Sequence, residues 1–243
     1  MFNIYRIFKK ETAGYFASPS TYVFLVIFLV LAPGLFLFLS NFFGEKAASM
    51  GAFFFFLPWL FLFFVPAIAM RVWAEEKRSG TEELLMTMPV RDWEAVLGKY
   101  FAAGFLLLLA LALTFPVPLM VAHFSAPKPP LDHGPILCGY LAAVLMGGAI
   151  LAIGTWASSL TVNQITAFVV TFAVAGVLLL CGASGVYERL GEFGRYLSEI
   201  SLFTHYNSMY RGVLDPKDIV YYLSVTAFFL FLNVRSVESR KWR

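Results

Sequence analysis

The chain has 243 residues, of which 60% are apolar and only 14% are charged, and its formal net charge is +3. Soluble domains are roughly half apolar and a quarter charged, so this chain would expose large sticky patches if it folded in water. The composition therefore excludes a water-soluble domain and predicts an all-α membrane protein. The two cysteines, Cys138 and Cys181, lie inside apolar runs and indicate neither a disulfide framework nor a metal cluster.

The first twenty residues predict an interface helix over Phe2–Phe16, ended by Ser18-Pro19-Ser20. Its apolar residues fall near one helical face: Ile4, Ile7, Phe8 and Tyr15. Its basic residues lie mostly on another face: Arg6, Lys9 and Lys10. The alternative is a plain basic segment that only fixes the topology.

Six apolar segments that lack Asp, Glu, Lys and Arg are predicted to span a membrane, for which roughly 20 residues are needed. They are Tyr22–Leu39, Ala52–Met70, Tyr100–Val121, Ile136–Leu160, Ile165–Cys181 and Ile219–Val234. The last two are the shortest.

Lys and Arg are distributed unequally between the two sides that these spans define. One side holds twelve of them: Arg6, Lys9, Lys10, Arg71, Lys77, Arg78, Arg91, Lys99, Arg235, Arg240, Lys241 and Arg243. The other side holds six: Lys46, Lys128, Arg189, Arg195, Arg211 and Lys217. Because basic residues are retained in the cytoplasm, both termini are predicted to be cytoplasmic.

The cytoplasmic connection 71–99 is predicted to contain a capped amphipathic helix. Ser79-Gly80 should stop the extension of the second span, and Thr81 is a candidate N-cap with Glu82 and Glu83 in the first turn. The helix would present Leu84, Leu85 and Met88 and end at Pro89. Such an element suits docking in a partner's groove, and the alternative is a simple connecting loop.

The outer connection 182–218 contains aromatic and aliphatic residues at helical spacing: Tyr187, Leu190, Phe193, Tyr196 and Leu197. We expect one or two short helices at the outer leaflet, with a solvated loop as the alternative. His123, His133 and His205 all fall in outer connections, and their spacing matches no zinc-ligand pattern. They are interpreted as ordinary polar loop residues.

Within the spans, three features concern packing. Gly139, Ala143 and Gly147 form a small-residue face that allows close helix approach. Four prolines are expected to kink their spans: Pro58, Pro66, Pro116 and Pro118. The runs 53–56 and 61–64 are phenylalanine-rich and are interpreted as lipid-facing bulk rather than a substrate path.

Several kinds of chemistry have no support in the sequence. The only Gly-Lys pair, Gly98-Lys99, lacks the rest of a P-loop, so ATP phosphates would not be bound by this chain. The absence of ionisable residues from the predicted spans disfavours a proton- or ion-coupled carrier. Glu75-Glu76 and Glu82-Glu83 are expected to form a solvated, partly ion-paired face rather than an acid–base pair.

The run Glu76-x-Arg78-x-Gly80-Thr81-x-Glu83-x-Leu85-x-x-x-Pro89-Val90 resembles the pattern of type-2 ABC exporter permeases, the ABC-2 family. Segments near both ends, Phe8-Lys9-Lys10-Glu11 and Tyr210-Arg211-Gly212-Val213-Leu214-Asp215, are similar to a gliding-motility-type branch of that family. One departure is Arg91, which stands where a small capping Ser or Thr is expected.

The resemblance implies a single transmembrane domain over residues 1–243. It would be a non-enzymatic permease that binds no cofactor and couples to a separate cytoplasmic ATPase holding ATP and Mg²⁺. A second permease copy, or a different permease, would complete a dimer in a bacterial inner membrane. The implied coupling interface comprises Glu75, Glu76, Arg78, Gly80, Thr81, Glu83, Leu84, Leu85, Met88 and Pro89, beside the interface-helix residues Arg6, Lys9 and Lys10.

Two other classes remain open from the sequence alone. A self-contained channel or carrier would transport without any ATPase. A membrane scaffold, for example in a motility machine, would require a protein partner on its outer face and would have no transport of its own.

Overall fold

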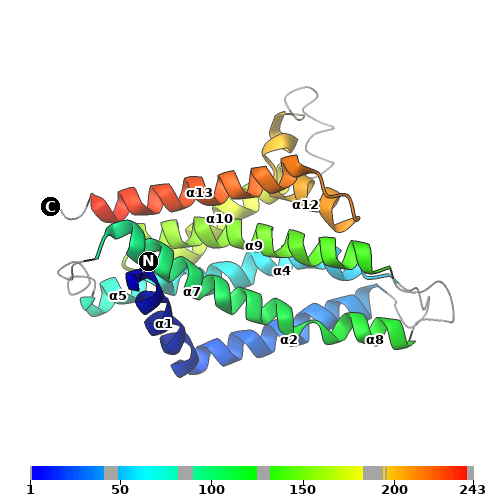
Figure 1. Cartoon of the computed structure of the whole chain (residues 1–243), viewed down its shortest axis with the longest axis horizontal. Helices are drawn as coiled ribbons and strands as arrows, with labels where there is room; N and C mark the ends of the chain where they lie inside the picture. Colours follow the sequence, from blue (N-terminus) through cyan, green and yellow to red (C-terminus); the bar gives the residue numbers. More distant parts are fainter. Residues whose placement is uncertain are drawn as a thin grey trace.

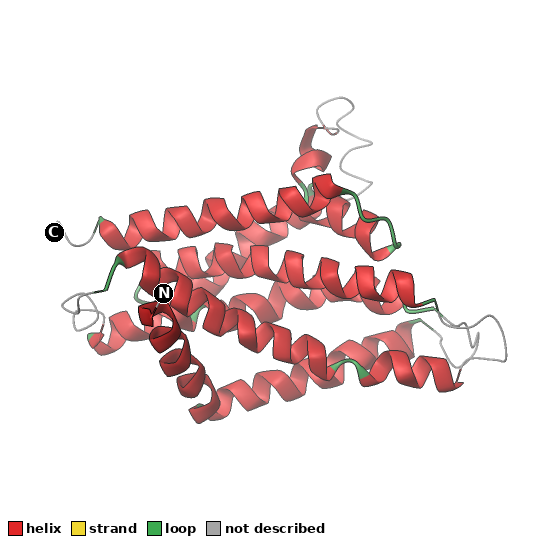
Figure 2. Cartoon of the chain, in the orientation of Figure 1, coloured by secondary structure: helices red, strands yellow, loops and turns green. Residues whose placement is uncertain are grey.

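The computed structural model describes residues 2–40, 49–81, 90–124, 132–182, 194 and 196–239. Over these residues the chain is helical, with no strand (Figure 2). The predicted all-α, polytopic fold is confirmed. The helices that Figure 1 labels are α1 Phe2–Ala17, α2 Pro19–Leu39, α4 Gly51–Ala69, α5 Arg71–Ser79, α7 Asp92–Leu113, α8 Pro116–Phe124, α9 His133–Leu160, α10 Gln164–Leu180, α12 Leu202–Tyr210 and α13 Pro216–Glu238.

Each predicted span falls on a helix of the bundle. Five stretches of the described chain are long and apolar enough to cross a membrane: 19–39, 51–79, 92–124, 133–160 and 216–238. The fifth predicted span corresponds to α10, an apolar helix of 17 residues, or about 26 Å at 1.5 Å per residue. The sixth span is longer than predicted, because α13 continues to Glu238.

The third span is interrupted, as its prolines predicted. α7 ends at Leu113, and α8 begins at Pro116 after a turn at 114–115. Proline lacks the N–H that a continuous helix requires. The Thr114 hydroxyl donates to the Leu111 carbonyl at 2.7 Å and lies 3.1 Å from the Tyr140 hydroxyl. By contrast, α4 remains one helix through Pro58 and Pro66.

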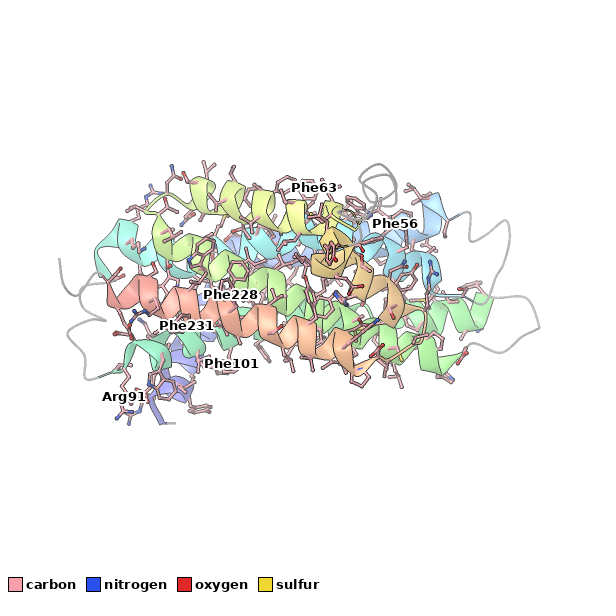
Figure 3. The ribbon with its side chains drawn as sticks, turned by 90° about the horizontal axis from the view of Figure 1, so that it is seen from above. Phe56, Phe63, Arg91, Phe101, Phe228 and Phe231 are labelled. Carbon is pink, nitrogen blue, oxygen red and sulfur yellow. The ribbon has the colours of Figure 1, made fainter. Side chains whose placement is uncertain are left out.

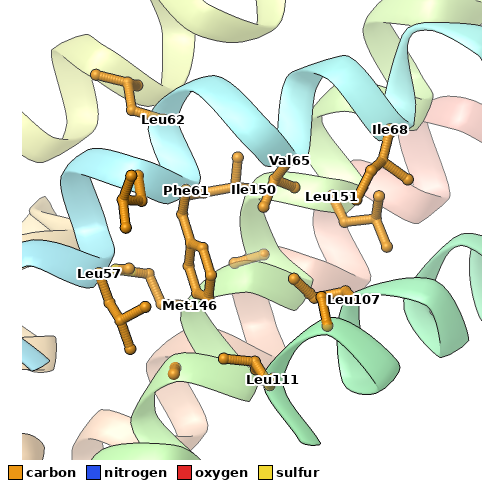
Figure 4. Close-up of a cluster of buried hydrophobic side chains, with 14 of the residues drawn as sticks. Leu57, Phe61, Leu62, Val65, Ile68, Leu107, Leu111, Met146, Ile150 and Leu151 are labelled. Atoms are coloured by element: carbon orange, nitrogen blue, oxygen red, sulfur yellow. The ribbon is translucent and has the colours of Figure 1, made fainter. Parts of the chain in front are cut away.

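The core is built around α9, which packs against α4, α7, α10, α12 and α13. Figure 4 shows its centre, where side chains of α4, α7 and α9 meet. Phe61 of α4, Leu107 of α7 and Ile150 of α9 are among the buried members of this cluster. Burial of such side chains from all three helices fixes their relative positions.

The interpretation of the phenylalanine runs as lipid-facing bulk is wrong for three of their seven phenylalanines. Phe53, Phe54 and Phe61 are buried in the core, whereas Phe55 and Phe63 are exposed. Figure 3 labels Phe63 on the outside of the bundle. The reason is helical periodicity, because consecutive residues point in different directions around α4. The buried rings pack against neighbouring rings: Phe53 meets Phe36 edge to face at 6.1 Å, and Phe61 stacks on Phe28 at 6.2 Å.

The predicted small-residue face on α9 is used for close packing. A Cβ atom placed on Gly139 would lie 2.6 Å from the Phe54 ring, and one on Gly147 would lie 2.7 Å from Leu107 Cδ2. The tightest such contact on α9 occurs at Gly154, which the sequence pattern did not single out. There, a Cβ atom would lie only 2.3 Å from Ala69 Cβ of α4 and 3.1 Å from Thr171 Cγ2 of α10.

The substitution Gly154→Ala is therefore expected to push α9 away from α4 and to lower the free energy of unfolding by about 1–3 kcal/mol, the usual cost of overpacking. The free energy of unfolding is measured on the purified protein in mixed micelles. Gly104→Ala is the matched control, since its Cβ would meet nothing closer than Leu151 Cδ2 at 3.8 Å. Equal stability of the two variants would contradict the close packing at Gly154.

One end of the bundle carries α12 and the expected short outer helices. Residues 196–200 are helical and α12 follows, which confirms helices in this connection. The residues 183–193 and 195 lie outside the described residues. The opposite end carries α5 and the last described residues of α13, with the first turns of α1 close by (Figure 1).

The interpretation of the histidines as loop residues is wrong for His205. It lies on α12, is 5% exposed, and places Nδ1 2.6 Å from Asp218 Oδ1 and Nε2 2.9 Å from the Glu199 carbonyl. Its ring stacks on Tyr221 at 4.0 Å. The contact between His205 and Asp218 joins α12 to the first turn of α13.

Candidate functional site

The second span continues into α5 at the end of the bundle where 71–99 was predicted to form the coupling interface. The Met70 N–H donates to the Pro66 carbonyl at 2.9 Å, so helical hydrogen bonding continues up to the residue that joins α4 to α5. α5 stops at Gly80, whose φ of +73° is left-handed and favours glycine. The predicted stop at Ser79-Gly80 is confirmed.

The predicted coupling-interface residues around this stop divide into two groups. Glu75, Glu76 and Arg78 lie on α5, and Gly80 and Thr81 follow directly. Thr81 does not serve as the predicted N-cap within the described residues; its hydroxyl instead lies 2.9 Å from the Ser79 hydroxyl. The remaining predicted interface residues, Glu83, Leu84, Leu85, Met88 and Pro89, lie outside the described residues, and the amphipathic helix there stays a prediction.

The predicted interface helix exists as α1, and its apolar face packs on α7. Ile7 is buried against Gly98, where an added Cβ would lie 2.8 Å from Ile7 Cβ. The Phe8 ring meets the Phe105 ring edge to face at 5.9 Å. The basic residues of α1 are exposed: Arg6, Lys9 and Lys10. α1 is therefore held by the bundle itself, with its cationic face outward.

Lys99 of α7 joins three helices at this end. Its Nζ lies 3.0 Å from Glu11 Oε1 of α1 and 2.9 Å from Glu76 Oε1 of α5. A third contact, to the Val72 carbonyl at 3.2 Å, supplies an acceptor for the last N–H of the ammonium group. The side chain is 1% exposed, and the ammonium lies 5.0 Å from the centre of the Trp73 ring.

Arg71 joins α5 to the turn between α1 and α2. Its Nε donates to Glu75 Oε2 at 3.1 Å, one turn along the same helix. Its Nη1 donates to the Ser18 hydroxyl at 3.2 Å and also to the Ser20 hydroxyl. The Ser-Pro-Ser turn that the sequence marked as a helix boundary is thus also an attachment point for α5.

Ser158 of α9 supports the junction between α4 and α5 from the other side. Its hydroxyl accepts from the N–H groups of Trp73 and Ala74, at 3.1 and 3.0 Å, and donates to the Met70 carbonyl at 2.9 Å. The Lys77 ammonium donates to the neighbouring Ser159 carbonyl. α5 is therefore bound on several sides, by α1, α7 and α9.

The start of α7 is capped without the expected Ser or Thr. Arg91 occupies the N-cap position, and its guanidinium has no acceptor with which to cap a helix. Glu94 provides the cap instead: Oε2 accepts from the Arg91 N–H and from Asn3 Nδ2, both at 3.1 Å. The second of these contacts ties the first turn of α1 to α7.

A polar cleft of about 300 Å³ opens between α1 and α5. Its lining includes Glu11, Tyr15, Arg71, Glu75 and Glu76. Burial is the main reason that the pKa of the Tyr15 hydroxyl lies well above its usual range. The cleft adjoins the exposed end of α5.

The contacts described above link α5 to the helices around it. Among the described residues, no group of three His, Cys, Asp or Glu side chains could hold a metal ion. The carboxylates of this corner, Glu11, Glu75, Glu76 and Glu94, are each paired with a cation or an N–H donor. A displacement applied to α5 would therefore be carried to α1, α7 and α9 together.

Sequence reasoning missed Lys99, Glu11 and Ser158 as members of the site. Lys99 was counted only as a basic loop residue, because the third span was expected to begin at Tyr100. A usable signal was present: Ala95, Lys99 and Ala102 are spaced along one helical face, and all three are buried. A cation on a buried helical face calls for a carboxylate partner.

The comparison with known families settles which class of membrane protein this is. A family model described as ABC-2 family transporter protein matches residues 39–234. The chain belongs to the ABC-2 transporter family. No curated protein matches the chain.

The family match covers the helices from α4 to α12 and most of α13, including the connection 71–99. The predicted family is thus confirmed for this ABC-2 protein, a multi-pass membrane protein. Helix α1 and nearly all of α2 precede the matched segment, so the Glu11–Lys99 contact joins α1 to a helix inside it.

Proposed function

We propose that this ABC-2 protein is the permease subunit of an ATP-driven exporter, and that a separate cytoplasmic subunit hydrolyses the ATP. The observation that carries the proposal is α5, which is continuous with the second span and bound to three other helices at its base. Membership of the ABC-2 family supports transport as the activity. ATP and Mg²⁺ would bind to the partner, and this chain would hold no cofactor.

In this mechanism the ATPase contacts the chain after Gly80 and pushes on α5. The predicted apolar residues Leu84, Leu85 and Met88 would supply the docking contact, and Pro89 the exit of the segment. The polar residues that receive the force would be Glu75, Glu76 and Arg78. Because Lys99 bridges Glu76 to Glu11, movement of α5 would also shift α1 and the base of α7.

The orientation that fits this mechanism places α5 and both ends of the chain in the cytoplasm of a bacterial inner membrane. The excess of Lys and Arg in the segments on that side supports it. A transport unit would contain two permeases, either two copies or this chain with a different one. The gliding-motility-type branch remains a proposal that rests on the end segments of the sequence.

Co-purification from native membranes in mild detergent tests the proposal. The wild type is expected to bring down a P-loop ATPase, and the triple variant Leu84→Asp, Leu85→Asp and Met88→Asp is expected to lose it. The double variant Val213→Asp and Leu214→Asp, which alters exposed residues near α12, is the control and should retain the partner. Recovery of folded wild-type chain without any nucleotide-binding protein would favour a self-contained channel or a scaffold.

A further inference from the structure

An apolar groove of about 460 Å³ runs between α10 and α13 on the outside of the bundle. Both helices pack on α9, and Figure 3 shows them on either side of it. The groove is lined by Ala173, Val174, Val177 and Leu178 of α10, Tyr221, Val225 and Phe229 of α13, and Ile200 before α12. A volume of this size lies within the range of roughly 300–1,000 Å³ that small-molecule sites occupy.

The groove has one polar end and one apolar end. At the α12 end, the Tyr221 hydroxyl donates to the Ile200 carbonyl, and His205 and Asp218 lie just beyond. At the other end the Phe229 ring meets Trp156 of α9 at 5.5 Å. Between them, the wall side chains carry no polar atom apart from the Tyr221 hydroxyl. This polarity matches an amphiphile whose head group lies at the α12 end.

The length of the groove fits a hydrocarbon chain that lies along it. Tyr221 and Phe229 are eight residues apart, or about 12 Å along α13. This is close to the thickness of one leaflet, half of a hydrocarbon core of about 30 Å.

We propose that the groove between α10 and α13 is a binding site for one acyl chain of a membrane lipid in the leaflet on the α12 side. The chain would lie along Val177 and Val225 and end near Phe229, with the head group beside Tyr221. This site does not depend on the proposed ATPase coupling. A bound acyl chain would keep α10 and α13 apart while both helices remain packed on α9.

Native mass spectrometry of the protein, extracted from phosphatidylethanolamine and phosphatidylglycerol vesicles, tests the site. Val225→Trp and Val174→Trp fill the groove and should each weaken retention of a bound lipid about tenfold, since burial of roughly two methylenes would be blocked. Leu223→Trp is the control, because Leu223 is 56% exposed at the same depth of α13. It should leave retention unchanged.

A lipid carrying a diazirine in its acyl chain adds a second readout on the unmodified protein. We expect the label on Val174, Val177 and Val225 in clear excess over Leu223 and Val220. Equal labelling of all five positions would mean ordinary annular lipid only and would overturn the proposal. Loss of a dimer in the groove-filling variants, with lipid retention unchanged, would assign the groove to a second copy of the chain instead.

Discussion

The substitution Lys99→Met is expected to lower the free energy of unfolding by about 3 kcal/mol, because breaking a buried ion pair leaves an uncompensated charge behind. Lys99 is 1% exposed and contacts two carboxylates at 3.0 and 2.9 Å. Glu11 and Glu76 are 19% and 15% exposed, so water relieves only part of the loss. Unfolding in mixed micelles gives the stability of each variant.

The triple variant Lys99→Met, Glu11→Gln and Glu76→Gln separates charge from packing. It removes all three charges and keeps similar side-chain volumes, so it should regain most of the stability that the single variant loses. If the triple variant is as unstable as Lys99→Met alone, the ionic account of this corner is wrong. The triple variant also tests the role of these charges in coupling. It should fold, yet couple ATP hydrolysis to transport poorly.

Ser158→Ala is the second change with a large expected effect, a loss of about 2–3 kcal/mol in the free energy of unfolding. It removes the acceptor of two buried backbone N–H groups, those of Trp73 and Ala74, and each buried donor left unpaired costs about 1–3 kcal/mol. It also removes the donor to the Met70 carbonyl at the α4–α5 junction.

Ser224→Ala is the matched control for this serine, because the exposed Ser224 hydroxyl donates only within its own helix, to the Tyr221 carbonyl. It should change stability by less than about 0.5 kcal/mol, as surface substitutions usually do. Hydrogen exchange of the Trp73 and Ala74 amides gives a local readout. These two amides should exchange faster in Ser158→Ala and at the wild-type rate in Ser224→Ala; unchanged exchange in both would contradict the role of Ser158.

The spans and helix boundaries could be predicted from the sequence because each depends on local chemistry. Runs of apolar residues mark the spans, Pro116 restarts the third one, and Ser18-Pro19 and Gly80 mark boundaries that the structure reproduces. The direction of the side chains around α4 was harder to predict. Its phenylalanine runs contain apolar residues on every side, so no polar face distinguishes the core from the lipid.

The contacts of the site could not be predicted, since they join residues distant in sequence. Glu11 and Lys99 are 88 residues apart, and Ser158 lies 85 residues from Trp73. His205 and Asp218 are closer in sequence, but their pairing depends on how α12 folds back against α13. The cap at Glu94 depends partly on Asn3, which lies on another helix.

Site-specific photo-crosslinking in living cells tests the central claim most directly. A photoreactive amino acid would replace Arg78 or Thr81, both exposed at the end of α5, and, in the control, Val213 at the opposite end of the bundle. The coupling account predicts an adduct with a P-loop ATPase from positions 78 and 81 and none from position 213. An ATPase adduct from position 213, or its absence from 78 and 81 in a correctly inserted protein, would contradict the account.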